Sequence, residues 1–139
     1  MALNWTDFVW TWKRWLSIYG LTSSSASLGI GYATGAGGAF TQLTSKATAV
    51  ELNTVCGAVT LNNANLAAAT VVSFVLTNST IAAGDLLILN HTATGTFGSY
   101  GLNARCAAGS ATIDVRNNTA GGLAEAIIIS FALIKGVVA

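Results

Sequence analysis

Three strand-like runs separated by two short turns occupy residues 99–135, and they constrain the fold more than any other part of the chain. In the middle run Ile113 and Val115 alternate with polar residues, which is the two-residue period of a strand with one dry face. The last run is apolar at almost every position. A run of this kind is buried on both faces, either within the subunit or, on one face, against another subunit. The region therefore predicts β-structure built around a buried final strand.

The same pattern of strand-like runs and turns extends over most of the chain. Short runs rich in β-branched and aromatic residues are separated by clusters of Asn, Gly, Ser and Asp. Seven or so short strands at this spacing predict an all-β domain over residues 43–139, an antiparallel β-sandwich of jelly-roll type with about seven or eight strands. Proline is absent, so proline does not interrupt strand edges, and we expect neighbouring subunits to protect some of them. The expected strands are residues 48–52, 58–61, 70–78, 86–91, 100–107, 112–117 and 126–135.

Residues 1–20 differ from the rest because they contain all four tryptophans. Large aromatic residues recur there at three- and four-residue spacing, which predicts a short α-helix with an aromatic face. A helix of about 14 residues is marginal alone and must pack on something. Three alternatives remain for the surface on which the helix packs. They are its own domain, copies of itself or a partner protein, and a membrane surface. The predicted contact residues of this helix are Trp5, Phe8, Trp12, Trp15 and Tyr19.

Residues 21–42 are dominated by Ser and Gly and are predicted to be a flexible linker. Their glycines do not make a nucleotide-binding loop. Such a loop needs a strand before it and a helix after it, and the Gly-Lys-Ser/Thr of a P-loop is missing.

Composition limits the function classes. Charged residues make up only 8% of the chain, against a usual share of about 25%, and the net charge is +1. So few charges suit a chain in a permanent assembly better than a free cytosolic enzyme. Nucleic-acid binding needs several phosphate-facing Lys or Arg residues, and they are lacking. No apolar run approaches the roughly 18–20 residues of a membrane span. Lys13 and Arg14 follow the aromatic run instead of preceding it, so we expect no secretory signal.

No residue pattern indicates catalysis, a metal or a cofactor. The single histidine, His91, is predicted to be a hydrogen-bonded residue at a strand end, and Asp85 to be a turn residue. Cys56 and Cys106 are expected to be buried free thiols, with a disulfide as the alternative. These residues do not supply the spacing of a zinc site. Neither a paired-carboxylate spacing nor a Gly-x-Ser-x-Gly elbow is present, so we expect a protein that is not an enzyme.

Asp114 and Arg116 are the polar pair on the middle strand. They either form a solvated outer face, which stabilises little, or make ion pairs between subunits. The partners considered for them are Lys46, Glu51 and Arg105.

Two blocks of sequence carry a resemblance to a known family. Residues 41–62 and residues 109–136 resemble the opening and closing blocks of a small-domain family common in tailed phages and prophages. The resemblance covers about residues 35–139. It implies a virion structural protein, a homotrimeric capsid decoration (cement) protein or head fibre, made in the host cytoplasm. Its partners would be other copies of itself and the major capsid protein or another virion protein.

A second function class stays open. A tail-fibre module that binds a receptor or a sugar would need an exposed aromatic platform with polar side chains around it. Phe97 and Tyr100, in a Gly-rich segment, are the only plausible platform.

Overall fold

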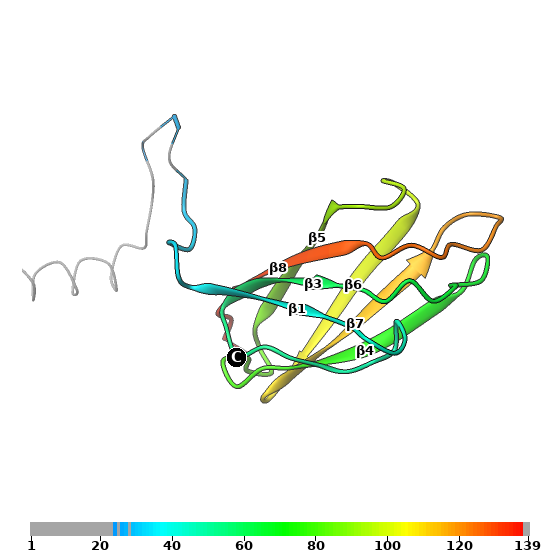
Figure 1. The fold of residues 1–139 in the computed structure, drawn as a ribbon. Coiled ribbons are helices and arrows are strands. Elements are labelled where there is room, and N and C mark those ends of the chain that lie inside the picture. The colour runs from blue at the N-terminus through cyan, green and yellow to red at the C-terminus, as the bar shows by residue number, and fades with distance from the viewer. Residues whose placement is uncertain (1–23, 25, 28, 138–139) are drawn as a thin grey trace, which may run out of the picture. The chain divides into compact units, whose positions relative to one another are not determined.

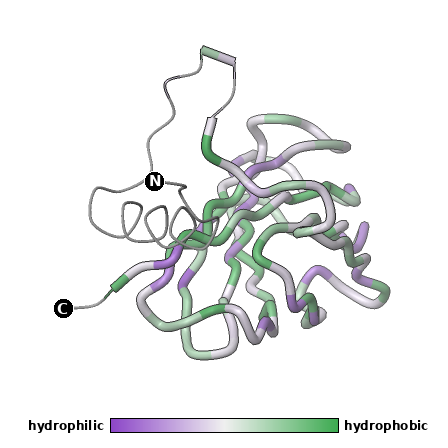
Figure 2. The backbone as a smooth tube through the Cα atoms, turned by 90° about the vertical axis from the view of Figure 1, so that its left-hand side faces the viewer, coloured by the Kyte–Doolittle hydropathy of each residue, from purple (hydrophilic) through white to green (hydrophobic). Residues whose placement is uncertain are grey.

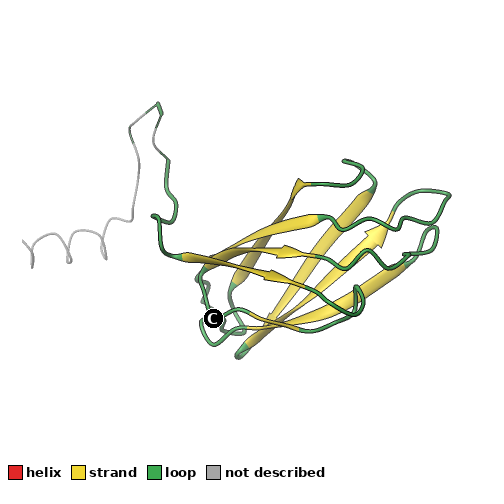
Figure 3. Ribbon diagram, in the orientation of Figure 1, coloured by secondary structure: helices red, strands yellow, loops and turns green. Residues whose placement is uncertain are grey.

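The computed structural model describes residues 24, 26–27 and 29–137, and the predicted N-terminal helix with its five contact residues lies outside them. The described residues form eight β-strands and no helix (Figures 1 and 3). All eight strands belong to one compact unit that begins at Tyr32. The strands are β1 (Gly37–Thr41), β2 (Val50–Glu51), β3 (Cys56–Thr60), β4 (Val71–Thr77), β5 (Leu86–Ala93), β6 (Tyr100–Ala107), β7 (Ser110–Asn117) and β8 (Ile128–Ile134).

The strands form two four-stranded sheets, in the orders β1-β3-β8-β5 and β2-β4-β7-β6. The prediction of an all-β fold is confirmed, whereas the expectation of purely antiparallel sheets is wrong. β1 pairs with β3 in parallel and β2 pairs with β4 in parallel, so both sheets are mixed. The cause is the path of the chain. Its first four strands alternate between the two sheets, so each returns to a sheet in the direction of the strand before last.

The two sheets share one hydrophobic core, which both sheets supply through alternating strand positions. In β4, Phe74 and Leu76 are buried while Val71 and Val75 are exposed, as the two-residue period requires. In Figure 2 hydrophobic and hydrophilic positions follow one another along the strands. The largest fully buried apolar side chains come from β2, β3, β4, β7, β8 and the adjoining loops: Val50, Val59, Leu61, Phe74, Leu76, Ile113, Val115, Ile127, Ile129 and Leu133.

All seven predicted strands are present, with bounds shifted by one or a few residues. β1 is the strand that the sequence pattern missed, because it lies in residues 21–42, which were predicted as a linker. Glycines in β1 and in its neighbour β3 allow the two strands to pack closely. A Cβ on Gly38 would lie 2.7 Å from a methyl group of Leu52, and one on Gly57 would lie 2.7 Å from the carbonyl oxygen of Gly38. The β-domain therefore begins before residue 43.

β8 is a central strand, with β3 on one side and β5 on the other. Ile129, Phe131 and Leu133 point into the core and are at most 4% exposed. The alternate residues point outward and are only partly covered, and Ile134 is 48% exposed. Among the described residues the final strand is thus buried on one face, and its second apolar face is partly exposed.

Candidate assembly surfaces

The outer face of sheet β1-β3-β8-β5, here called the neutral face, carries no charged side chain. Its large apolar residues are unusually accessible, with Leu86 62%, Ile88 53% and Ile134 48% exposed. Leu86 is opposite Ile134 in the antiparallel register, so these two lie side by side. The outward residues, from the edge at β1 to the edge at β5, are Gly37, Ala39, Thr41, Cys56, Ala58, Thr60, Ile128, Ser130, Ala132, Ile134, Leu86, Ile88, Asn90 and Thr92.

Sequence reasoning missed the accessible residues of β5. The signal was present in the run Leu86-Leu87-Ile88-Leu89, which is apolar at the positions that face either side of the sheet. A strand of this kind supplies one face to the core and leaves the other apolar. Leu87 and Leu89 pack against the core, and Leu86 and Ile88 do not.

The outer face of sheet β2-β4-β7-β6, here called the charged face, is organised around Asp114. Its carboxylate accepts hydrogen bonds from the hydroxyl of Ser73 at 2.6 Å and from the Asn103 amide at 3.5 Å. The Arg105 guanidinium forms an ion pair with it at 3.4 Å. The hydrogen bond from Ser73 and the neighbouring groups lower the pKa of Asp114. Asp114 is therefore satisfied inside its own chain, by residues of β4 and β6.

Arg116, the other predicted contact residue of this strand, behaves differently. It is exposed, and it makes no hydrogen bond or ion pair among the residues that the structure describes. It borders a shallow depression of about 310 Å³. The register places Gly101 directly beside Arg116, and the missing side chain there helps to leave the surface hollow. The depression is lined by Val71, Gly101, Leu102, Asn103, Asp114 and Arg116.

Of the three partners considered for these residues, Lys46 is excluded as a surface group. It is 3% exposed and its amine donates to the carbonyl oxygens of Asn62 and, at 2.6 Å, of Glu125. Burial lowers the pKa of Lys46, and the Glu125 carboxylate opposes that shift. Arg105, which was considered as a partner between subunits, pairs with Asp114 within one chain.

Glu51 remains, at the end of the edge strand β2 on the charged face. Its carboxylate accepts a hydrogen bond of 3.3 Å from the Asn53 side chain. Within the part of the chain that the structure describes, it faces no basic group in an ion pair.

A polar and aromatic cluster closes the end of the domain near β5 and β6. Phe97 is 64% exposed and stacks on His91, with ring centroids 4.5 Å apart and an interplanar angle of 27°. His91 Nε2 is 2.6 Å from the carbonyl oxygen of Thr94, in keeping with the predicted strand-end role, while its buried Nδ1 has no partner. Tyr100 is 9% exposed, so it is not half of an open aromatic platform.

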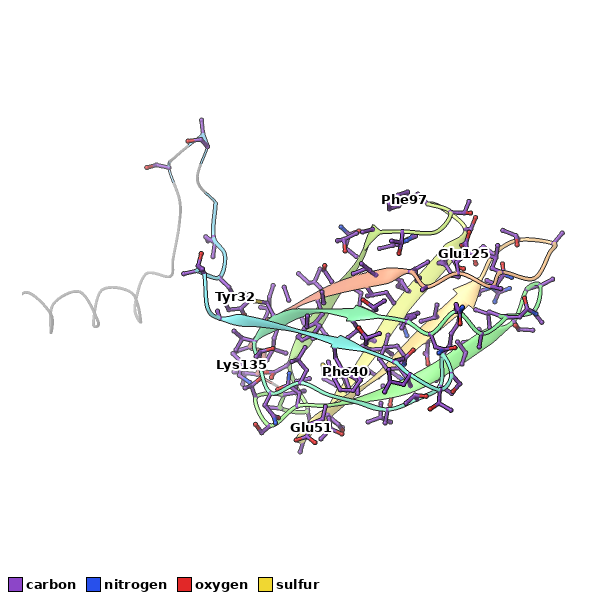
Figure 4. All side chains as sticks on the ribbon, viewed as in Figure 1. Tyr32, Phe40, Glu51, Phe97, Glu125 and Lys135 are labelled. Atoms are coloured by element: carbon purple, nitrogen blue, oxygen red, sulfur yellow. The ribbon has the colours of Figure 1, made fainter. Side chains whose placement is uncertain are left out.

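Glu125 fixes this cluster in place. The Tyr100 hydroxyl donates to it at 2.9 Å, and Thr96 donates through its hydroxyl at 2.6 Å and its amide at 3.0 Å. These hydrogen bonds, those of Thr96 first, lower the pKa of Glu125. Burial, followed by the bond to Glu125, raises the pKa of Tyr100. Phe97 and Glu125 lie at the end of the domain opposite Glu51 and Lys135 (Figure 4).

Asp85 is a turn residue, as predicted, and also a clasp for the end of the last strand. Its carboxylate accepts hydrogen bonds from the amide of Ala82 at 2.7 Å and the amide of Gly136 at 3.1 Å. It also forms an ion pair with Lys135 at 2.5 Å. The bond from Lys135 is the main cause that lowers the pKa of Asp85. The carboxylate thus joins the loop before β5 to the segment after β8.

Two Asn-x-Thr sequences are turn devices. Asn78 and Asn117 are both 0% exposed. Each side-chain oxygen accepts hydrogen bonds from the amide and the hydroxyl of the threonine two residues later, Thr80 or Thr119. The side chains of these two asparagines are therefore inaccessible in the folded chain.

The remaining predictions concern the two cysteines, metal binding and membrane-spanning helices. Cys56 and Cys106 are free thiols, half-buried on different sheets. Among the described residues no three His, Cys, Asp or Glu side chains gather as a metal site requires. The same residues include no helix of the length and hydropathy that crossing a membrane would demand.

Comparison with known proteins returned no match: no family model, no curated protein and no solved structure is significantly similar to this chain.

Proposed function

We propose that this chain is a structural protein of a tailed-phage particle, a capsid decoration protein or head fibre that works as a homotrimer. The observation that carries the proposal is the neutral face. A four-stranded sheet shows Leu86, Ile88 and Ile134 to solvent with no charged residue among them. An apolar surface of this kind on a water-soluble domain marks a site of association.

The architecture supports the proposal as well. Eight strands in two four-stranded sheets are the strand and sheet count of jelly rolls, which recur in viral capsid and lectin domains. The parallel pairs β1/β3 and β2/β4 depart from the antiparallel connections of that fold. The resemblance of residues 35–139 to phage proteins points to the same class.

The size of the neutral face favours multivalent attachment. With strands about 4.8 Å apart and outward residues about 6.7 Å apart, a face four strands wide and about four outward residues long covers roughly 500 Å². A standard interface buries about 800 Å² on each partner. One copy would therefore hold weakly to a capsid, and an oligomer would hold much more firmly because its copies bind together.

Quantitative mass spectrometry of purified particles tests this function. Hundreds of copies in each particle are expected for a decoration protein. Absence of the chain from particles released by cells that make it would overturn the proposal. Light scattering of the purified full chain tests the trimer separately, and a monomer at all concentrations would contradict self-assembly.

The second candidate is a receptor- or sugar-binding module of a tail fibre. The observation that favours it is the exposed Phe97, whose ring is held by His91 beside the Glu125 cluster. Stacking of a sugar on an aromatic ring is a common mode of recognition. The Glu125 oxygens are already used by Thr96 and Tyr100, which leaves few polar groups for a ligand. A few copies at one vertex and glycan-array binding lost in Phe97→Ala would favour this candidate.

A further inference from the structure

The charged face holds two opposite charges that have no ion-pair partner among the residues that the structure describes. Lys46 is buried, Arg105 is paired with Asp114, and Lys135 is paired with Asp85. Among the described residues this leaves Arg116 as the unpaired cation, and Glu51 and Glu125 as carboxylates outside any ion pair. Glu125 is held by Thr96 and Tyr100 at the end of the domain, so Glu51 is the one on the charged face.

These two residues are too far apart to pair within one chain. Glu51 is in register with Thr77, and Thr77 with Ser110, whereas Arg116 is six residues further along β7. At about 3.3 Å for each residue, the two charges are roughly 20 Å apart along the strands. Both point outward from the same sheet, since the neighbouring Val50 and Val115 are buried.

We infer that the charged face is a contact between copies of this chain, in which Glu51 of one copy binds Arg116 of the next. The occupant is a second copy because this surface supplies both members of the pair. Two copies that meet around a two-fold axis form both pairs at once, and copies in a ring form one pair at each contact.

The surface between the two charges fits such a contact. β4 lies between β2, which carries Glu51, and β7, which carries Arg116. On β4, Val71 is 51% and Val75 42% exposed. Apolar residues at the centre with polar residues around them are the usual anatomy of a protein–protein interface.

The depression beside Arg116 suits a glutamate side chain. Val71 and Leu102 offer apolar walls for its two methylene groups, and the Arg116 guanidinium offers paired donors for its carboxylate. Asp114 also lines the depression, but Arg105 meets its charge at 3.4 Å. Arg116 therefore leaves the depression with one net positive charge.

This inference rests on the proposed function, because it names the surface by which the assembling chain meets its own copies. Sedimentation or light scattering of the full chain over a range of concentrations tests it. Glu51→Arg and Arg116→Glu are each expected to raise the dissociation constant about 10- to 100-fold, since each places like charges opposite one another. The double variant Glu51→Arg/Arg116→Glu restores the pair with its members exchanged, so it should associate within about threefold of wild type.

The control is Asn90→Arg, which adds a charge to the neutral face and should leave association between copies within about threefold of wild type. Circular dichroism checks that every variant is folded. Wild-type association should also weaken as salt rises, since salt screens exposed ion pairs.

Two results would overturn the inference while self-assembly still stands. One is an oligomer that neither single reversal weakens. The other is a double variant as weak as the worse single variant, because that outcome means that Glu51 and Arg116 do not meet. A wild-type chain that is always monomeric would instead count against both the inference and the assembly part of the proposed function.

Discussion

The two sheets are alike inside and different outside. Phe74 and Phe131 belong to the shared core, one from each sheet, and both are nearly inaccessible. Outside, one sheet presents a neutral face with exposed Leu86, Ile88 and Ile134, and the other presents Glu51, Asp114, Arg105 and Arg116. The inner faces therefore account for folding. The core leaves the outer faces free to differ, and we propose that each makes a different contact in an assembly.

The largest expected effects test the likeness of the two inner faces. Phe74→Ala and Phe131→Ala should each lower the free energy of unfolding by about 3–5 kcal/mol, because each removes a buried aromatic ring and leaves a cavity. Denaturant unfolding of both variants measures the effect. If one sheet tolerates its loss with less than about 1 kcal/mol, the two inner faces do not contribute equally to one core.

The buried turn asparagines come next, and both belong to the sheet with the charged face. The Asn117 amide donates to the carbonyl oxygens of Leu66, Ala67 and Gly121 at 3.0, 3.1 and 2.7 Å. Asn117→Ala should cost about 2–4 kcal/mol, since buried carbonyl groups lose their donors.

Asn78 is the matched comparison, because its amide donates only to the carbonyl oxygen of Thr54. We expect Asn78→Ala to cost less than Asn117→Ala in the same unfolding measurement. The reverse order would mean that the number of hydrogen bonds donated by the side-chain amide does not determine how much each turn contributes to the free energy of unfolding.

Acid unfolding should show different contributions to stability from the carboxyl groups of Asp85 and Asp114. The pKa of each carboxyl is lowered below its usual value of 3.8. Each therefore contributes stability that is present above about pH 3.8 and is lost as the pH falls through its folded-state pKa. Asp85 has a side chain 1% exposed and Asp114 one that is 20% exposed.

We expect Asp85→Asn to flatten the melting temperature between pH 2 and pH 5 more than Asp114→Asn does. Thermal unfolding in that range, with both variants beside wild type, measures the difference. Equal slopes for the two variants would show that the bonds from Lys135, Ala82 and Gly136 do not give Asp85 the larger share of the acid response.

The smallest expected effect on stability concerns the outer faces. Ile88→Asp and Val75→Asp change exposed residues and should alter the free energy of unfolding by no more than about 0.5–1 kcal/mol. Their effects on association should differ, however. Val75→Asp should weaken contact between copies, and Ile88→Asp should weaken attachment to the particle. Loss of both functions in both variants would contradict the division of labour between the faces.

The sequence predicted the strands well because their pattern is local. In β4 and β7 the alternation of buried and exposed residues is readable from neighbours alone, and both strands lie close to their predicted positions. The parallel pairs are not readable in this way, because pairing depends on which sheet the chain returns to. β1 was missed because its two glycines are typical both of a linker and of a tightly packed edge strand.

The candidate site was predictable only in part. Arg116 and Glu51 stood out because charges are rare in this chain, but their lack of partners depends on the three-dimensional positions of Lys46 and Arg105. Lys46 shows the limit most clearly. A lysine in a polar loop is usually exposed, whereas this one is buried because two backbone carbonyl groups meet its amine.

The position of β8 has a consequence for how the chain matures. Of the eight described strands it is the last to be synthesised, yet it lies between β3 and β5 and joins them into one sheet. Until residues 128–134 have left the ribosome, sheet β1-β3-β8-β5 consists of two separate pieces with an open gap between them. This sheet can therefore close only after residues 128–134 have emerged.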